Sequence, residues 1–383
     1  MHKQTLVIIT TILLLATAGI LYMSWGDSFG SELDARGAAS FGAGGFYINF
    51  DGNVLYQSVS DELGFYILER RNIRRYDIYG QRLWERTMSH ANPVFVQSGH
   101  YIGVGSHLAR TFYVFGLNGL MYTLDFDNDI LSYHVACNGY SAVLSVNEYG
   151  GYYIEVFNAS GVRVMRRVLD ERNLFPISMA ISPDARTLIV SYLDVSGSGM
   201  LSYICAYDIY SGELFASFRQ IEGEIISQVA FIDHDHLMFS SAEQLGVYRL
   251  GTEPRISYVW SNDFEAQAAF VEVVDGVGIA VAYGQSRLGA ESALEDRLVI
   301  YSYAGDTLAE YFMSGGIRYL SVGTGAVIIG GGPLRREFAA IDYNNRIVWR
   351  YTATSDVLDF VMLDIPERAL LATPTRMQIM EAN

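Results

Sequence analysis

The sequence contains little cysteine, proline or lysine, and these shortages narrow the classes of protein to which it can belong. Its two cysteines, Cys137 and Cys205, form no disulfide framework, so both are expected to be buried free thiols. There are only seven prolines and no long amphipathic helical pattern, whereas Tyr, Phe, Val, Ile and Gly are abundant. This composition predicts an all-β protein of many short strands and tight turns. Half of the residues are apolar, which is enough for a packed core.

Basic side chains are also scarce. Lys3 is the only lysine, and the formal net charge is −16. The densest basic run, residues 69–75, places its arginines around a strand junction among acidic residues, so we interpret it as a solvated hairpin. Because phosphate binding requires clustered basic side chains, the sequence argues against a nucleic-acid partner.

Residues 175–220 set the pattern for the chain. They contain four β-rich runs, at 177–182, 187–193, 201–209 and 213–218. Pro183-Asp184 ends the first run and Ser211-Gly212 separates the last two, and both pairs favour tight turns. Four antiparallel strands within about forty-five residues form one blade of a β-propeller.

The turn between the third and fourth strands recurs along the chain at intervals of 39 to 53 residues, as propeller blades do. The seven turns are Tyr79-Gly80-Gln81, Asn118-Gly119, Ser160-Gly161, Ser211-Gly212, Gly251-Thr252, Ala304-Gly305 and Asn344-Asn345. After the last turn come a fourth strand at 347–351 and three further strands, at 357–363, 369–372 and 377–380. Residues 46–50 can supply the missing strand and close the ring, because closure hides the apolar edges. The sequence therefore predicts an eight-bladed β-propeller, with seven blades as the alternative should residues 246–260 not form a unit.

The repeats resemble those of known propellers. Residues 206–215 and 340–349 are similar to the Ala-x-Asp…Gly…Trp repeats of quinoprotein-like propellers, and residues 181–184 to the first hairpin of WD-type repeats. Trp84, Trp260 and Trp349 fall near the ends of fourth strands, where large rings pack between blades. With an N-terminal anchor, the layout resembles an uncharacterised family of membrane-anchored propeller proteins of Gram-positive bacteria. That resemblance implies the fold only, and it transfers no functional residue.

The N-terminus predicts a membrane anchor. Residues 6–25 carry no charge and are long enough to cross a bilayer as a helix. With Lys3 on one side and acidic residues on the other, residues 1–5 are expected in the cytoplasm, and the propeller, at 46–383, outside it beyond a flexible linker at 26–45. The alternative is a signal peptide cleaved near Ala16-Thr17-Ala18. Either route exports the propeller, and the uncleaved anchor makes it a single-pass protein of the cell membrane.

The two rims of the predicted disc differ. Second-to-third-strand loops and the connectors between blades share one rim, called here the connector rim, and the remaining turns share the other, the turn rim. Both long insertions, 195–200 and 284–296, lie on the connector rim, which is also acidic. Its acids are Asp125, Asp127, Asp129, Asp170, Glu171, Glu222, Glu224, Asp263, Glu265, Glu291, Glu295 and Asp296. Because the linker enters on the turn rim, we expect the connector rim to face away from the membrane and to bind a protein or glycan.

Two short motifs carry metal-type ligands. Asp125, Asp127 and Asp129 alternate as in calcium loops, but the glycine and distal glutamate of such loops are missing, so a solvated connector is the competing interpretation. Residues 233–236, Asp-His-Asp-His, occupy a hairpin position that turn chemistry explains equally well.

The function predicted from these observations is a binding or scaffold module for a protein, peptide or glycan, without a cofactor. The sequence has no nucleophile elbow, phosphate loop or zinc-hydrolase motif. The alternative is a propeller enzyme, such as a hydrolase, a lyase or a quinone-dependent oxidoreductase, with its site at the mouth of the central channel.

Overall fold

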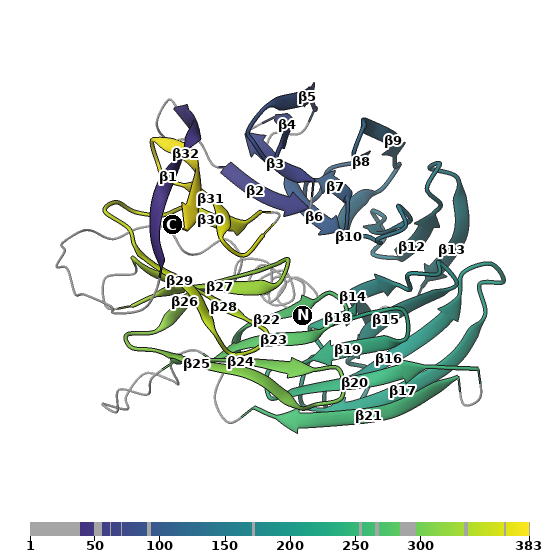
Figure 1. The fold of residues 1–383 in the computed structure, drawn as a ribbon. Helices are drawn as coiled ribbons and strands as arrows, with labels where there is room; N and C mark the ends of the chain where they lie inside the picture. Colours follow the sequence, from purple (N-terminus) through teal and green to yellow (C-terminus); the bar gives the residue numbers. More distant parts are fainter. Residues whose placement is uncertain are drawn as a thin grey trace. The chain divides into compact units, whose positions relative to one another are not determined.

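The computed structural model describes residues 39–49, 56–61, 63–69, 71–89, 93–170, 173–252, 255–264, 268–283, 296–332, 336–363 and 365–382. These residues form β-strands joined by turns (Figure 1). Among them, no helix has the length and apolar character that a membrane span requires. The predicted tail, the predicted anchor at 6–25 and most of the predicted linker lie outside the described residues.

The strands form four-stranded antiparallel blades, numbered here in chain order. Blade 1 comprises β2 (Tyr56–Asp61), β3 (Gly64–Glu69), β4 (Asn72–Asp77) and β5 (Arg82–Thr87). Blade 2 comprises β6 (Val94–Ser98), β7 (Tyr101–Gly105), β8 (Thr111–Gly116) and β9 (Gly119–Asp125). Blade 3 comprises β10 (Asp129–Val135), β11 (Ser141–Val146), β12 (Tyr152–Phe157) and β13 (Arg163–Leu169). Blade 4 comprises β14 (Leu174–Ile181), β15 (Thr187–Asp194), β16 (Leu201–Asp208) and β17 (Leu214–Glu222).

The second half of the chain continues the same pattern. Blade 5 comprises β18 (Gln228–Phe231), β19 (His236–Ser240), β20 (Gln244–Leu250) and β21 (Ile256–Asp263). Blade 6 comprises β22 (Ala268–Val274), β23 (Gly278–Tyr283), β24 (Asp296–Ser302) and β25 (Thr307–Met313). Blade 7 comprises β26 (Ile317–Gly323), β27 (Ala326–Gly331), β28 (Glu337–Asp342) and β29 (Ile347–Thr352). Blade 8 comprises β30 (Asp359–Met362), β31 (Arg368–Ala372), β32 (Arg376–Ala382) and β1 (Ala39–Asn49).

Blade 4 shows why this sequence forms blades. The middle strand β15 is buried from Thr187 to Tyr192, because both of its faces pack against neighbouring blades. The turn between β16 and β17 is held by Asp208, whose Oδ1 accepts hydrogen bonds from the backbone N–H groups of Tyr210 and Ser211. Gly212 follows with φ of 72°, a left-handed conformation that glycine adopts without strain. All seven predicted turns between third and fourth strands are confirmed.

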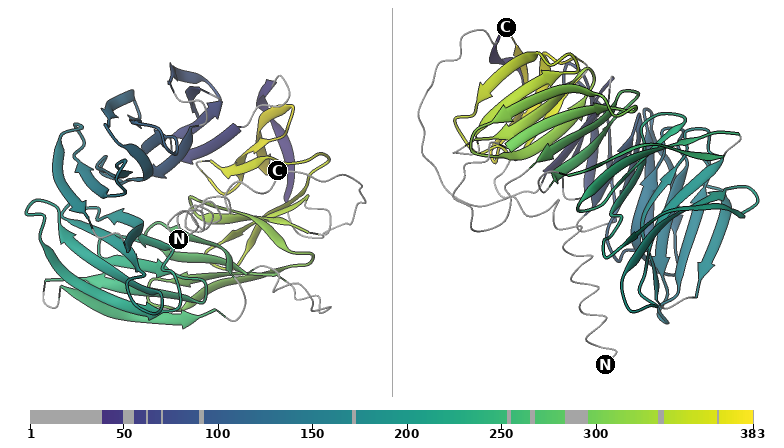
Figure 2. Two further views of the ribbon diagram at one scale, coloured as in Figure 1. Left: turned by 180° about the vertical axis from the view of Figure 1, so that it is seen from behind. Right: turned by 90° about the horizontal axis from the view of Figure 1, so that it is seen from below.

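The eight predicted blades are confirmed, and they are arranged in a ring (Figures 1 and 2). Buried apolar side chains form eight clusters, and each cluster joins one pair of consecutive blades, including blade 8 with blade 1. The core is therefore distributed over eight interfaces. Residues 246–260 belong to blade 5, so the seven-bladed alternative is wrong.

The ring closes through the N-terminal strand, as predicted. Strand β1 lies antiparallel to β32, with Ile48 opposite Met377 and Tyr47 opposite Gln378. Its start also pairs in parallel with β29, where Ala39 lies opposite Trp349, so blades 7 and 8 share one hydrogen-bonded sheet. The strand begins at Ala39, seven residues before the predicted start, because backbone pairing recruits a Gly- and Ala-rich segment that has no side-chain periodicity.

The three tryptophans pack between blades, as predicted. The indole N–H of Trp84 donates to the carbonyl of Leu117, that of Trp260 to Tyr303, and that of Trp349 to Pro366, each in the next blade. Trp349 is fully buried. Each indole ring thus packs between two blades, and the hydrogen bond of its N–H group joins the outer strand of one blade to a turn of the next.

The cysteine prediction is only half correct. Cys205 is buried in β16, but Cys137 is exposed. The inner strand β10 ends at Val135, and Cys137 lies in the turn that follows, which Ala136 closes by hydrogen bonds to Gly139 and Tyr140.

Candidate functional site

The connector between blades 2 and 3 holds the predicted calcium-type ligands. Asp125 accepts a hydrogen bond of 2.9 Å from the hydroxyl of Thr111, and Asp129 forms an ion pair of 2.9 Å with Arg110. Asp127 is exposed and forms no ion pair with a described residue. Across the described ranges, no three His, Cys, Asp or Glu side chains gather where they could hold a metal ion. The connector is thus braced by the blade 2 loop at 106–110.

The Asp-His-Asp-His motif forms the turn between β18 and β19. Oδ1 of Asp233 accepts hydrogen bonds from the backbone N–H groups of Asp235 and His236, and its carboxylate lies 2.8 Å from Nδ1 of His236. The His236 ring stacks on Tyr303 of blade 6, with 4.5 Å between the ring centres. These contacts give Asp233 and His236 structural partners within the turn rim.

The connector rim carries most of its unpaired carboxylates on one arc of the ring. Seven exposed carboxylates of this rim form neither an ion pair nor a side-chain hydrogen bond with a described residue: Asp127, Glu148, Asp170, Glu222, Glu243, Asp263 and Glu337. Six of them, all except Glu337 of blade 7, lie on blades 2 to 5 or on the connectors that leave these blades. Two arginines of the rim, Arg110 and Arg336, are paired with Asp129 and Asp356, while Arg71 of blade 1 is exposed. The acidic arc is defined here as those six residues.

Several predicted acids of this rim cannot be placed. Glu171, Glu265, Glu291 and Glu295 lie outside the described residues, as does most of the long loop at 284–296. Glu224 is engaged, because its carboxylate accepts a hydrogen bond of 2.6 Å from Ser241.

The turn rim has a different character, because it exposes large apolar side chains. These are Leu63, Tyr79, Leu83, Leu120, Met121, Val162, Tyr210, Leu214, Tyr303 and Ile365. They come from blades 1, 2, 3, 4, 6 and 8 and do not share one strand or one turn. Among the described residues, the connector rim exposes fewer such side chains: Leu108, Tyr149, Met200 and Leu358. The turn rim also carries exposed carboxylates, such as Glu213, Asp306 and Glu367.

A cavity of about 330 Å³ opens between the outer parts of blades 3 and 4. In seven blades the pairing of the third and fourth strands shifts register near the turn between them. The fourth-strand residue paired just before that shift is Trp84, Tyr122, Met165, Ala216, Trp260, Ala309 or Trp349. At the interface of blades 3 and 4 this residue is Met165, which is buried in the core and does not line the cavity.

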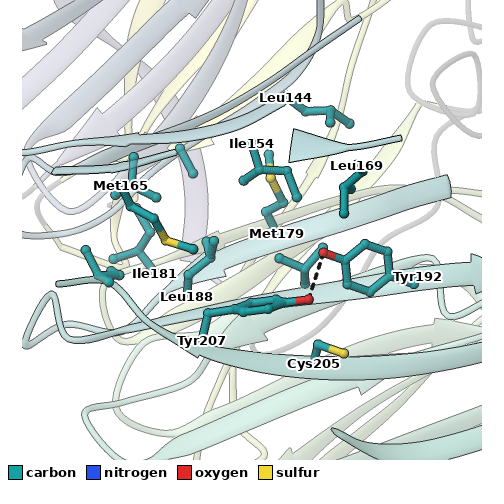
Figure 3. Packing of buried hydrophobic residues seen from close by; sticks show 14 of the residues in the cluster. Leu144, Ile154, Met165, Leu169, Met179, Ile181, Leu188, Tyr192, Cys205 and Tyr207 are labelled. Atoms are coloured by element: carbon teal, nitrogen blue, oxygen red, sulfur yellow. Dashed lines mark hydrogen bonds between the residues drawn. The ribbon is translucent and has the colours of Figure 1, made fainter. Parts of the chain in front are cut away.

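The lining of this cavity combines a cation with hydroxyl groups and apolar surface. The Arg167 guanidinium of β13 lies 4.5 Å from the centre of the Tyr207 ring, and the Tyr207 hydroxyl donates to that of Tyr192 at 3.1 Å (Figure 3). Burial raises the pKa of Tyr192 to about 12, and it also raises the pKa of the Cys205 thiol. Leu214, Ser217 and Gln220 of β17 complete the outer wall and are exposed.

The central channel is lined by the inner strands. Asp359 of β30 joins three blades, because its carboxylate accepts hydrogen bonds from Ser58 of blade 1, at 2.5 Å, and from Tyr319 of blade 7, at 2.8 Å. Burial raises the pKa of Asp359. His134 lies on blade 3 and Glu272 on blade 6; burial lowers the pKa of His134 to about 4 and raises that of Glu272 to about 7. These two groups belong to blades that are not neighbours.

Replacing Glu272 by glutamine is expected to stabilise the protein at alkaline pH. The pKa of Glu272 is about 7 in the folded protein, above its ordinary value of 4.5, so folding favours the protonated form. That contribution is fully present below pH 4.5 and is lost as the pH rises through 7. The Gln variant should gain about 1 kcal/mol on wild type between pH 4.5 and 8, which is less than the full pKa shift implies because the Glu272 side chain is accessible to solvent. Urea unfolding at both pH values measures this, with Glu148→Gln as control; equal pH profiles would contradict it.

Sequence reasoning missed Arg167 and the cavity. The run at 163–167 contains Arg163, Arg166 and Arg167. Alternation along a strand predicts that Arg163 and Arg167 point to one face of the sheet and Arg166 to the other. Arg163 and Arg166 nevertheless both contact Glu155, at 2.5 and 3.7 Å, across a register shift in the sheet. The lining residues lie on five strands and meet only in the folded protein, so no local pattern in the sequence marks this cavity.

Comparisons with known proteins agree on the fold. BamB from Moraxella catarrhalis is 14% identical, with a TM-score of 0.51, and the match covers 90% of this chain and 98% of BamB. Sqt1 from Chaetomium thermophilum is 11% identical, with a TM-score of 0.55, covering 86% of this chain and 95% of Sqt1. Sqt1 from Saccharomyces cerevisiae is 9% identical, with a TM-score of 0.54, covering 87% of this chain and 100% of Sqt1. At these identities the likeness shows the propeller fold alone.

No curated protein sequence matches the chain. One family model does, over residues 52–381, and this range contains every described strand except β1 and the last residue of β32. The chain therefore belongs to the family of unknown function DUF5711.

Proposed function

We propose that the protein is a membrane-tethered, extracytoplasmic binding module whose acidic arc receives a basic segment of a partner protein. The observation that carries this proposal is the set of six exposed carboxylates on blades 2 to 5 that form neither an ion pair nor a side-chain hydrogen bond with a described residue. A group of negatively charged carboxylates on a rigid surface attracts a cationic partner and accelerates its association.

The scaffold beneath the arc is suited to binding, because it holds the connectors in place. The backbone N–H groups of Leu108 and Phe126 donate to the carbonyls of Ile130 and Arg110, which ties a blade 2 loop to the connector that bears Asp127. At the connector between blades 4 and 5, the hydroxyl of Ser202 donates to the carbonyl of Glu224 at 2.7 Å. Loops that are fixed in this way lose little conformational entropy when a partner binds.

The tether is the part of the proposal that depends on residues 6–25. Strand β1 starts beside the end of β32, with Phe41 opposite Ala382, so the chain enters the propeller on the turn rim. An anchor that precedes this strand would hold the turn rim towards the bilayer and leave the acidic arc open to partners. The exposed apolar side chains of the turn rim would then be the ones nearest the membrane.

Neutralising the acidic arc is expected to weaken binding of a lysine-rich decapeptide by about tenfold at low salt. The triple variant Asp127→Asn, Asp170→Asn, Glu222→Gln tests this by titration calorimetry at increasing NaCl concentration. Its matched control is Glu213→Gln, Asp306→Asn, Glu367→Gln, which removes the same charge from exposed positions on the turn rim. Equal weakening by both variants would show a response to net charge and would refute a site on the arc. In fractionated cells, the full chain should sediment with membranes, and a chain lacking residues 6–25 should not.

A further inference from the structure

We propose that the cavity between blades 3 and 4 binds a small monocarboxylate with an aromatic or apolar body, whose carboxylate pairs with Arg167. The site lies on the outer face of the ring, and it is independent of the acidic arc and of the proposed function. Arg167 comes from the outer strand of blade 3, and the remaining wall comes from blade 4.

Arg167 is one of several arginines whose guanidinium stacks on an aromatic ring. Seven arginines in the described residues do so. Five of them also have a carboxylate or amide acceptor: Arg75 with Asp61, Arg166 with Glu155, Arg219 with Gln244, Arg297 with Glu310, and Arg368 with Glu381. Arg255 is exposed to solvent. Arg167 is partly buried, and no carboxylate or amide of the described residues accepts from it.

The Arg167 guanidinium therefore carries unused hydrogen-bonding capacity inside the protein. Its Nε is buried and has no hydrogen-bond partner. Burying a guanidinium N–H without an acceptor is costly, and a carboxylate that binds two N–H groups of one guanidinium restores what was lost. Across the interface, the neighbouring groups are the hydroxyls of Tyr192 and Tyr207, which are neutral. The site thus has one positive charge to satisfy, and this favours a monoanion.

The remaining walls define the rest of the ligand. Leu174 and Leu201 supply apolar surface, and the rings of Tyr192 and Tyr203, with centres 5.7 Å apart, supply aromatic surface. A cavity of about 330 Å³ is within the size range of small-molecule sites. The exposed Ser217 and Gln220 at the outer wall give polar contacts near the opening. A phenyl ring between these walls would place its carboxylate beside Arg167.

The test uses 3-phenylpropionate as probe, with 3-phenylpropanamide as its neutral counterpart and inorganic phosphate as an anion without an apolar body. Titration calorimetry of the folded protein should detect the carboxylate, with the amide and phosphate each weaker by about tenfold or more. Arg167→Gln should weaken binding of the carboxylate to the level of the amide. The matched control, Arg166→Gln, changes a neighbouring arginine of the same strand that is paired with Glu155, and it should bind as wild type does.

A second measurement keeps the test decisive if Arg167→Gln does not fold. Cys205 lines the cavity, and Cys137 is the only other cysteine. In a Cys137→Ser background, 3-phenylpropionate should slow the reaction of Cys205 with a thiol reagent severalfold, and the amide should not. No detectable binding at about 10 mM, equal binding of acid and amide, or equal thiol protection by both would overturn the proposal.

Discussion

An Asp61→Ala variant is expected to lose about 3 to 5 kcal/mol of stability, because it leaves a buried arginine without its counter-ion. Arg75 is 1% exposed, and its guanidinium binds Asp61 through two hydrogen bonds, of 2.9 and 3.2 Å. The same guanidinium lies 4.5 Å from the centre of the Tyr66 ring, and Asp61 Oδ2 lies 3.3 Å from Nδ1 of His100 in blade 2. Removing the carboxylate breaks both the pair within blade 1 and its contact with blade 2.

The informative control is the double variant Asp61→Leu, Arg75→Met, which removes both charges and keeps apolar volume. It should recover most of the lost stability, because replacing a buried ion pair by packed apolar groups is often neutral. Urea unfolding at pH 7 compares wild type, the single variant and the double variant. A single variant that costs less than about 1 kcal/mol, or a double variant no better than the single one, would contradict this account.

This ion pair also marks where sequence reasoning was wrong. The run at 69–75 was predicted to be a solvated hairpin, and Arg74 fits that interpretation, since it pairs with Glu69 and Glu85 at the surface. Arg75 does not fit it. Along a strand, neighbouring side chains point to opposite faces, and the face that carries Arg75 is covered by another blade. Which arginine is covered depends on a partner, Asp61, in another strand, and a charge run in the sequence does not reveal that partner.

The blade architecture could be predicted from the sequence because several blades carry a short polar residue that fixes the turn between their third and fourth strands. Asp77, Asn158 and Asp342 each accept hydrogen bonds from backbone N–H groups two and four residues later, so a residue with a short polar side chain fixes the hairpin locally. Such local chemistry can be read from the sequence. The cavity at blades 3 and 4 could not be read in this way, because it is formed by Arg167 of one blade and side chains of the next, which are brought together only by packing between blades.

Removing residues 39–49 is expected to have the largest effect on stability, because strand β1 both completes blade 8 and covers blade 1. Phe46 contacts Phe65 and Tyr76, with ring centres 5.9 and 5.7 Å apart. The Phe46 ring also occupies the space beside Gly80, where an added Cβ would lie 2.1 Å from a ring carbon. Phe46 is partly buried, so losing its ring costs less than the ~3 to 5 kcal/mol of a fully buried phenylalanine, but the shortened chain additionally leaves the edge of β32 unpaired.

A separate peptide with the sequence of β1 should bind the shortened chain, because it can pair with the exposed edge of β32 as an added strand. A synthetic peptide of residues 39–49, added to the shortened chain, is expected to restore the urea midpoint of the full-length protein. The matched peptide with Phe46→Ala keeps the backbone pairing and loses the ring, so it should restore only part of the stability. If the shortened chain were as stable as the full one, blade 8 would not need β1. If both peptides worked equally well, closure would depend on backbone pairing alone, and the Phe46 ring would contribute nothing to the contact between blades 8 and 1.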